Sequence, residues 1–221
     1  RPLDEAELRT LADRLRKMKV EAVAVSFLNS YGNPAHEERA ATLLRQWLPD
    51  VFVTSGIELT REWYEYERTS TAAANAYVGP RLNDYVHRLE SALRERGLSK
   101  TFYLMASSGG VFSVERACQQ PVMLVESGPV GGCIGASVYA REMGWDKIIA
   151  FDMGGTTAKC AVVEQGSFDV KSPYYVGGYA KGFPIRGAVL DIVEVGAGGG
   201  SIAWLDAEGR MAVGPRSAGS A

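Results

Sequence analysis

The apolar positions in the first half of the chain switch repeatedly between helical and strand-like spacing. Apolar residues at three- and four-residue intervals predict one helix over 4–19 and a second over 33–48. Each is followed by a short apolar run, at 22–28 and 51–54, and the first of these is rich in valine, as in strands that are buried on both faces. The order helix, strand, helix, strand favours parallel pairing with helical crossovers.

The segment 56–68 is charged and aromatic without clear periodicity, and we expect it to connect elements on the domain surface. A long helix is predicted over 70–96, with a bend or restart at Gly79-Pro80 and an end at Gly97. The earlier order then repeats in shorter form, as strand, helix, strand and helix over 101–106, 113–118, 122–125 and 127–143.

After this point the pattern changes to short strands joined by tight glycine turns. The runs 148–153, 158–164 and 168–176 predict an antiparallel β-meander. No low-complexity linker interrupts the chain, so we expect its parts to pack together. The predicted fold class is therefore α/β, with a mixed sheet, flanking helices and a β-meander.

Composition narrows the classes of function. The formal net charge is -2, which argues against nucleic acid or an anionic membrane as the main partner. No signal-peptide pattern opens this sequence, and no apolar run in it approaches the ~20 residues that a membrane span needs. The three cysteines form no CxxC pair, which is typical of buried thiols in a reducing compartment. We expect a cytoplasmic protein whose two histidines, on charged helix faces, are solvated.

The two ends of the sequence predict a piece of a longer protein. The chain begins at Arg1 rather than methionine, and it ends at Ser220-Ala221 just after the turn-rich Gly214-Pro215. We therefore expect that a segment outside this sequence carries part of the active site.

The clearest chemical feature is a turn between two apolar runs, in the sequence IIAFDMGGTTAKCAVVE. Gly154 and Gly155 let backbone N–H groups approach an anion, and Thr156 and Thr157 add hydroxyl donors. Asp152 would repel a phosphate unless it held Mg²⁺ or its waters. We interpret the turn as a phosphate-binding hairpin, with Asp152 as the catalytic and metal-binding residue. The alternative is an ordinary type I′ hairpin.

Two further glycine-rich segments are candidate ligand loops. Ser108, Gly109 and Gly110 follow the predicted strand 101–106, and in open α/β sheets ligands bind at that end of a strand. Gly198, Gly199 and Gly200 belong to GAGGGS, whose sixth position is serine and which precedes a strand-like run. A dinucleotide-binding role is therefore disfavoured. The choice between a nucleotide or substrate loop and a structural bend stays open.

Six motifs together resemble the hydantoinase A/5-oxoprolinase family. In chain order they are YERTSTAAANAYVGP, ASSGGVFS, ESGPVGGCIGA, FDMGGTTAKC, VEVGAGGGSIAW and VGPRSAGS. The resemblance covers the chain from about Val20 onward, and it is specific to the family but not to one substrate. The hairpin also resembles the second phosphate motif of the superfamily that includes actin, heat-shock chaperones and sugar kinases.

The resemblance implies two RNase H-like halves of the actin-like ATPase type, with ATP in the cleft between them. Residues 1–98 would end the N-terminal hydantoinase/oxoprolinase half, and 99–221 would begin the hydantoinase A ATPase half. The helix 127–139 resembles the connecting helix of such proteins, and we interpret its small face as a surface for tight packing. That face comprises Gly131, Gly132, Gly135 and Ala136.

The chain departs from the family pattern in two ways. Lys159 stands where many relatives carry aspartate. The second carboxylate that those relatives have at the hairpin is therefore not expected in this chain. The family's first phosphate motif and its downstream adenosine-binding segment are absent from this sequence. We therefore expect the isolated piece to bind ATP poorly.

The chemistry that the resemblance implies is phosphorylation of a carbonyl oxygen by ATP with Mg²⁺. In cyclic amides this step prepares the ring for opening by water, and in ketone carboxylases the enolate oxygen is phosphorylated before carboxylation. A hydantoinase B-type subunit or domain completes either reaction. We expect part of a cyclic amidohydrolase of the hydantoinase or 5-oxoprolinase type, such as N-methylhydantoinase. The alternatives are a subunit of an acetone or acetophenone carboxylase, a chaperone- or actin-like nucleotide switch, and a non-catalytic scaffold.

Overall fold

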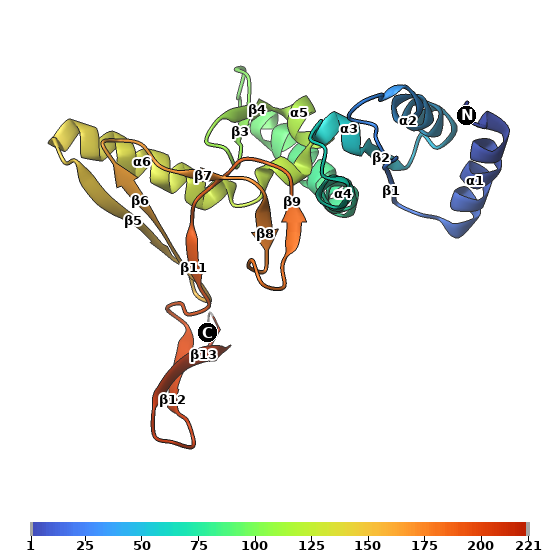
Figure 1. Cartoon of the computed structure of the whole chain (residues 1–221). Helices are drawn as coiled ribbons and strands as arrows, with labels where there is room; N and C mark the ends of the chain where they lie inside the picture. The colour runs from blue at the N-terminus through green and yellow to red at the C-terminus, as the bar shows by residue number, and fades with distance from the viewer. Residues whose placement is uncertain (1, 220–221) are drawn as a thin grey trace. The chain divides into compact units, whose positions relative to one another are not determined.

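A computed structural model describes residues 2–219 (Figure 1). The chain divides into two compact units. The first unit comprises Arg1–Val125 and Ser172–Val189, and the second comprises Glu126–Lys171 and Leu190–Ala221. The boundary predicted between residues 98 and 99 lies inside the first unit. The last residue of the VGPRSAGS motif, Ser220, and the two chain ends lie outside the described residues.

The first unit opens with the predicted helix–strand–helix–strand order. Its elements are α1 (Glu5–Met18), β1 (Ala22–Val25), α2 (Ala35–Trp47) and β2 (Phe52–Ser55). The Asp4 side chain caps α1 by accepting hydrogen bonds from the amides of Ala6 and Glu7. Strands β1 and β2 pair in parallel, which confirms the predicted crossover. Both helices pack on them through a small apolar core that includes Ala12, Val25, Ala40, Leu44 and Val53.

The segment predicted to be a surface connector is exposed at 61–64, as expected, but its two ends are helical and reach the interior. It forms the short helix α3 (Gly56–Leu59) and the first turn of α4 (Glu65–Glu95). Arg68 is fully buried. At Arg68 the prediction failed because apolar periodicity does not register a charged residue that is buried with its partners. Helix α4 also continues through Pro80 without a restart.

The predicted second run of strand, helix, strand and helix over 101–143 is wrong in its second strand and in the pairing of its first. Strands β3 (Tyr103–Met105) and β4 (Val111–Ser113) form an antiparallel hairpin, which α5 (Val114–Gln119) follows. The predicted strand 122–125 is a 3-10 helix, η1 (Pro121–Leu124). Pro121 favours a helical start, and the Val122 amide donates to the Asn75 side chain on α4, 3.0 Å away. The hairpin of β8 (Tyr174–Val176) and β9 (Phe183–Ile185) completes the unit.

The second unit contains the predicted helix α6 (Ser127–Met143) and a three-stranded antiparallel sheet. Strands β5 (Lys147–Met153) and β6 (Ala158–Glu164) pair along their whole length, and β11 (Val193–Val195) pairs with the other edge of β6. The predicted third strand of the meander, 168–176, is therefore wrong. Ser172-Pro173 interrupts it, because proline cannot donate a ladder hydrogen bond. A separate hairpin of β12 (Ser201–Leu205) and β13 (Met211–Ser217) follows.

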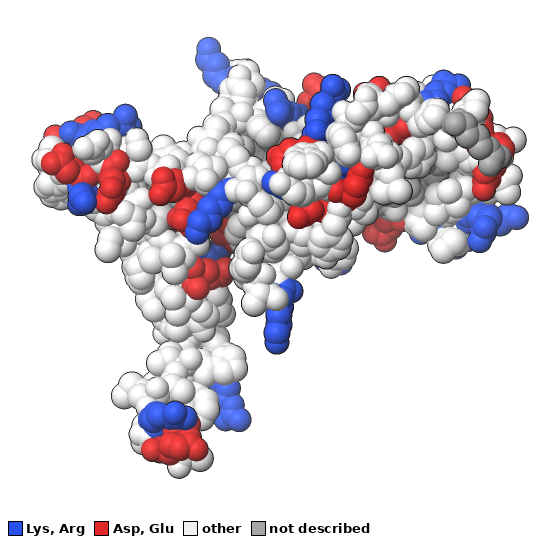
Figure 2. Space-filling view, viewed as in Figure 1, with Lys and Arg blue, Asp and Glu red and all other residues white. Residues whose placement is uncertain are grey.

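Two very short strands, β7 (Val170–Lys171) and β10 (Val189–Leu190), mark where the chain passes between the units. The mixed α/β class is confirmed. On the face shown in Figure 2, acidic and basic side chains intermingle. Among residues 2–219, no helix combines the length and the apolar character that crossing a bilayer requires.

Candidate functional site

The predicted phosphate hairpin is formed by the ends of β5 and β6. Asp152 lies opposite Lys159 and Met153 opposite Ala158 in the antiparallel register. The Gly154 amide donates to the Thr157 carbonyl over 2.9 Å, which closes a tight turn. The sequence folds this way because the apolar strand residues pair along both arms and the two glycines tolerate the sharp bend.

The residues of the turn are largely exposed, and several of its hydrogen-bond donors have no partner in the described part of the chain. Gly154, Gly155 and Thr156 are exposed, and Thr157 is half-buried. Within the described part of the chain, no hydrogen-bond partner occurs for the amides of Gly155, Thr156 and Thr157 or for the two threonine hydroxyls. Successive unpaired N–H groups in one turn form a concave site that suits an anion.

The second glycine-rich segment packs directly on this turn. The Gly199 and Gly200 amides donate to the carbonyls of Gly154 and Gly155, over 2.9 and 2.8 Å. A Cβ atom on Gly198 would lie 2.5 Å from the Gly154 oxygen, so the close approach requires glycine here. The two motifs, distant in sequence, thus form one backbone assembly. Strand β12, not a helix, follows the loop, so the helix of a dinucleotide-binding site is missing.

Lys159 forms its ion pairs with acidic groups other than Asp152, although the charge of Asp152 also helps to raise the pKa of Lys159. Its ammonium group forms an ion pair with Glu126 and lies 3.8 Å from a Glu194 oxygen. Burial would lower the pKa of Lys159, but the hydrogen bond and charge of Glu126 outweigh burial and raise that pKa. Asp152 is exposed and has no ion pair among residues 2–219, so its carboxylate is available to a cation.

Mg²⁺ commonly binds one or two carboxylates together with phosphate oxygens and waters. Asp152 fits such a role as a single protein ligand. In the described ranges no cluster of three or more His, Cys, Asp or Glu side chains could hold a metal without further ligands. A cation here would therefore depend on the phosphates that the turn is suited to bind.

A cavity of about 120 Å³ lies between α6 and the sheet, beside Asp152. Gly132, Cys133 and Ala136 line it from the helix, and Lys159 lines it from β6. A Cβ atom on Gly132 or Gly135 would meet nothing within 4 Å, so nothing in the described chain packs tightly on these two positions of the small helix face. The cavity is smaller than the ~300–1,000 Å³ of typical ligand pockets.

Ser108, Gly109 and Gly110 belong to the first unit and form the turn between β3 and β4. The Ala106 amide donates to the Gly110 carbonyl over 2.8 Å. The adjacent Ser107 is buried, and its hydroxyl donates to main-chain carbonyls of the segment after α5. This turn was proposed as a site because ligands bind at the carboxyl ends of strands in open α/β sheets. That argument is wrong here, because β3 and β4 form an antiparallel hairpin. Ser108 is nevertheless exposed and lines a separate cavity.

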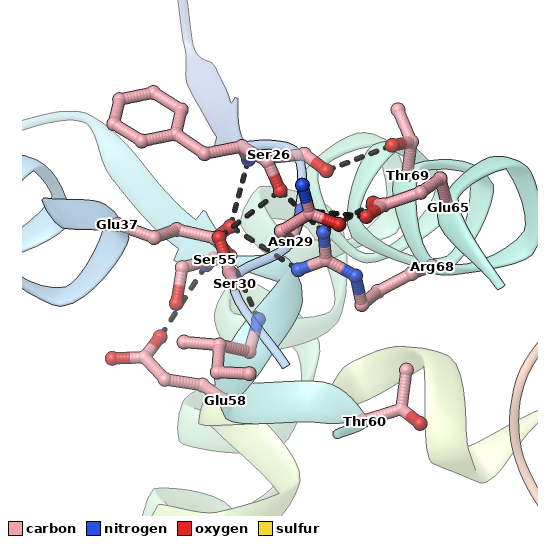
Figure 3. Close-up of polar contacts among 12 residues, drawn as sticks. Ser26, Asn29, Ser30, Glu37, Ser55, Glu58, Thr60, Glu65, Arg68 and Thr69 are labelled. Atoms are coloured by element: carbon pink, nitrogen blue, oxygen red, sulfur yellow. Dashed lines mark hydrogen bonds and ion pairs between the residues drawn. The ribbon is translucent and has the colours of Figure 1, made fainter. Parts of the chain in front are cut away.

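Sequence analysis missed a buried ionic network in the first unit, shown in Figure 3. The side chains of Arg68 and Glu37 are both fully buried, and Arg68 Nη1 lies 3.2 Å from Glu37 Oε2. Arg68 Nη2 also forms an ion pair with Glu65 Oε2 over 2.5 Å. The Glu37 carboxylate accepts the amides of Phe27, over 2.7 Å, and Ile57, over 2.8 Å.

This network fixes the segments that follow β1 and β2. One signal could have found it: Glu37 falls on the same face of α2 as Ala40, Ala41 and Leu44, where an apolar residue is expected. A carboxylate in that position predicts a buried cation as its partner.

Comparisons with known proteins agree with the motifs. A model of the hydantoinase/oxoprolinase family matches residues 68–221, and a model of the hydantoinase/oxoprolinase N-terminal region matches residues 1–48. The caprolactamase subunit alpha of Pseudomonas jessenii is 37% identical over 99% of this chain and 31% of its own length. The acetophenone carboxylase gamma subunit of Aromatoleum aromaticum is 33% identical over 100% of this chain and 30% of its own length.

The fold is also similar to a solved structure. The crystal structure of ATP-dependent caprolactamase from Pseudomonas jessenii has a TM-score of 0.84 at 36% identity, over 99% of this chain and 31% of that one. The chain thus spans about a third of the length of these relatives. The family model covers well over half of the chain, and it includes the hairpin, the glycine loop and most of α4. The chain therefore belongs to the hydantoinase/oxoprolinase family.

Proposed function

We propose that the chain is part of an ATP- and Mg²⁺-dependent enzyme that phosphorylates the carbonyl oxygen of a cyclic amide and so prepares the ring for hydrolysis. The observation that carries this proposal is the exposed turn after Asp152, whose amides at Gly155, Thr156 and Thr157 have no hydrogen-bond partner in the described part of the chain. ATP would supply the phosphoryl group. In this proposal the two halves are RNase H-like, and segments outside this sequence complete the nucleotide site.

Each side chain at the hairpin then has a defined task. The turn amides and the hydroxyls of Thr156 and Thr157 donate to phosphate oxygens, and each such bond to a charged group contributes roughly 1.5–3 kcal/mol. Asp152 orients the cation or its waters. The glycine loop holds the turn in shape, because its amides at Gly199 and Gly200 donate hydrogen bonds to the turn carbonyls. Catalysis of this type depends on positioning and on electrostatic stabilisation.

A second candidate is a subunit of a ketone carboxylase that phosphorylates an enolate oxygen. The observation that favours it is the 33% identity to an acetophenone carboxylase subunit, close to the 37% identity to a caprolactamase subunit. Both relatives are named as subunits, which supports a partner subunit of the hydantoinase B type in either case.

The deciding experiment measures ATP hydrolysis by the full-length protein with its partner subunit. Caprolactam, a hydantoin and 5-oxoproline form one set of substrates, and acetone and acetophenone with bicarbonate form the other. We expect a cyclic amide to stimulate phosphate release, with a ring-opened product formed in step. Stimulation by ketones alone would favour the carboxylase. Stimulation only by an added polypeptide or filament would favour a nucleotide switch, and no turnover at all would favour a scaffold.

A further inference from the structure

A cavity of about 370 Å³ in the first unit is lined by two arginines that have no part in the phosphate hairpin of the second unit. Three segments that are distant in sequence meet at it: the loop after α3, the SSGG turn with α5, and the segment after β9. Its volume falls within the ~300–1,000 Å³ of small-molecule pockets. We propose that this cavity binds the carboxylate group of a small molecule through Arg186, Arg116 and Ser108.

Arg186 provides a buried donor that lacks a partner. Its side chain is only 9% exposed, and one guanidinium nitrogen lies 2.7 Å from a Glu62 oxygen. The guanidinium carbon stacks 4.1 Å from the centre of the Tyr64 ring. Its Nε is buried and has no hydrogen-bond partner in the described structure. An unpaired buried donor is unfavourable, which marks Arg186 as a cation whose hydrogen-bonding capacity the described chain does not fully satisfy.

The backbone of Arg186 is fixed in place. Its amide donates to the Thr71 hydroxyl on α4 over 2.7 Å, and the same hydroxyl donates to the Glu67 carbonyl over 2.6 Å. The next residue, Gly187, lies so close to Met123 that a Cβ atom would come 2.8 Å from its sulfur. The arginine is therefore preorganised before any ligand arrives, which favours affinity.

Arg116 provides a second cation at the same cavity. Its guanidinium carbon lies 4.6 Å from the centre of the Phe112 ring, and within residues 2–219 it forms no ion pair. Ser108 adds an exposed hydroxyl donor. Arginine presents planar paired donors that match a carboxylate.

The charge of the lining favours a monoanion. The only ionised side chains that line the described cavity are Arg116, Arg186 and Glu62, which leaves one net positive charge. Leu59, Phe112 and Met123 supply an apolar side suited to a ring or an alkyl chain. A nucleotide would bring several negative charges, and the exposed turn in the second unit suits it better.

Two kinds of molecule in the proposed reaction carry a carboxylate. One is a cyclic amide with a carboxylate substituent, and the other is the open-chain amino acid that ring opening produces. Identifying either as the ligand rests on the proposed function, whereas carboxylate binding itself does not. The probes are therefore L-5-oxoproline, 2-pyrrolidinone and L-glutamate. The first two are both five-membered lactams and differ only in the carboxylate.

The test is calorimetric titration of the full-length protein without ATP. We expect L-5-oxoproline or L-glutamate to bind at least about tenfold more tightly than 2-pyrrolidinone. Arg116→Gln should weaken carboxylate binding about tenfold and leave 2-pyrrolidinone unchanged. Arg81→Gln, an exposed arginine of α4 away from the cavity, is the matched control and should change neither.

Each outcome has a clear reading. Tighter binding of L-glutamate would assign the site to the product, and tighter binding of L-5-oxoproline would assign it to the substrate. Equal affinity for all three probes, or a failure of Arg116→Gln to weaken binding of the carboxylate probes selectively, would overturn the proposal. Carboxylate-selective binding in a protein that never uses ATP would refute only the proposed function.

Discussion

Gly198 lies so close to Thr156 that a Cβ atom on the glycine would come within 2.6 Å of the threonine amide nitrogen. The contact joins two motifs that are about forty residues apart, and it involves only backbone atoms. The shape of the phosphate turn therefore depends on the absence of a side chain elsewhere in the sequence.

Gly198→Ala should disrupt the turn. The added methyl group has to displace the hairpin backbone, and overpacking of this kind costs about 1–3 kcal/mol. We expect the KM for ATP to rise and thermal stability to fall. Gly196→Ala is the matched control, because a Cβ atom there meets nothing within 4 Å. Identical behaviour of the two variants would contradict the role given to this contact.

Asp152→Asn should abolish most ATP turnover by the full-length enzyme without unfolding it. The side chain is exposed, so its loss leaves no buried group unpaired, whereas a neutral amide binds Mg²⁺ weakly. We expect a loss of at least about a hundredfold in kcat, with an unchanged melting temperature. Asp146→Asn, also exposed and just before the other end of β5, should keep full activity. Normal turnover by the Asp152 variant would favour a scaffold.

Glu37→Gln should destabilise the first unit strongly. The change removes the fully buried one of the two carboxylates that pair with Arg68, the one at 3.2 Å, and leaves only the partly exposed Glu65. Breaking a buried pair costs about 3–5 kcal/mol. Its neighbour provides the control: Glu38 is half-exposed and lies 3.8 Å from Arg61, so Glu38→Gln should cost at most about 1 kcal/mol. Urea unfolding of both variants measures the difference, and similar midpoints would show that the network contributes little.

The Glu65 carboxylate should make stability depend on acid pH. Burial would raise the pKa of Glu65, but its bonds to Arg68 and to the Asn29 amide outweigh burial and hold that pKa below its usual 4.5. A carboxyl whose folded pKa is depressed stabilises the protein above its usual pKa, and the contribution is lost as pH falls through the lowered value.

The measurement is the free energy of unfolding as a function of pH for the wild type and Glu65→Gln. We expect the wild type to be more stable near neutral pH, and the gap to close as the pH drops below 4.5. A gap that persists unchanged at strongly acidic pH would mean that the charge of Glu65 has no part in it.

Local patterns in the sequence predicted the elements that depend on local physics. Helices α1 and α2 follow apolar spacing, α6 ends at the predicted Gly144, and the β5–β6 hairpin follows from two apolar runs around Gly154-Gly155. The hairpin could be predicted as a candidate phosphate site because its residue types and spacing are contiguous in the chain. Whether it binds phosphate stays a prediction.

What sequence reasoning missed depends on contacts between distant segments. The burial of Arg68 requires Glu37 from another helix, and the 3-10 turn at Val122 requires the side chain of Asn75. The packing of Gly198 on the hairpin likewise leaves no periodic trace. In each case a tertiary partner overrides the local preference, and no window of neighbouring residues contains that partner.

The first unit is discontinuous, since the segment Ser172–Val189 returns to it after the chain has entered the second unit. No single uninterrupted stretch of sequence can therefore be excised as that unit. A truncation after Val125 would delete β8, β9 and Arg186. Glu62 would then lose its ion pair with Arg186, and Tyr64 would lose the guanidinium that stacks on its ring. Limited proteolysis within 126–171 should accordingly leave two fragments that stay associated, rather than release a free-standing N-terminal piece.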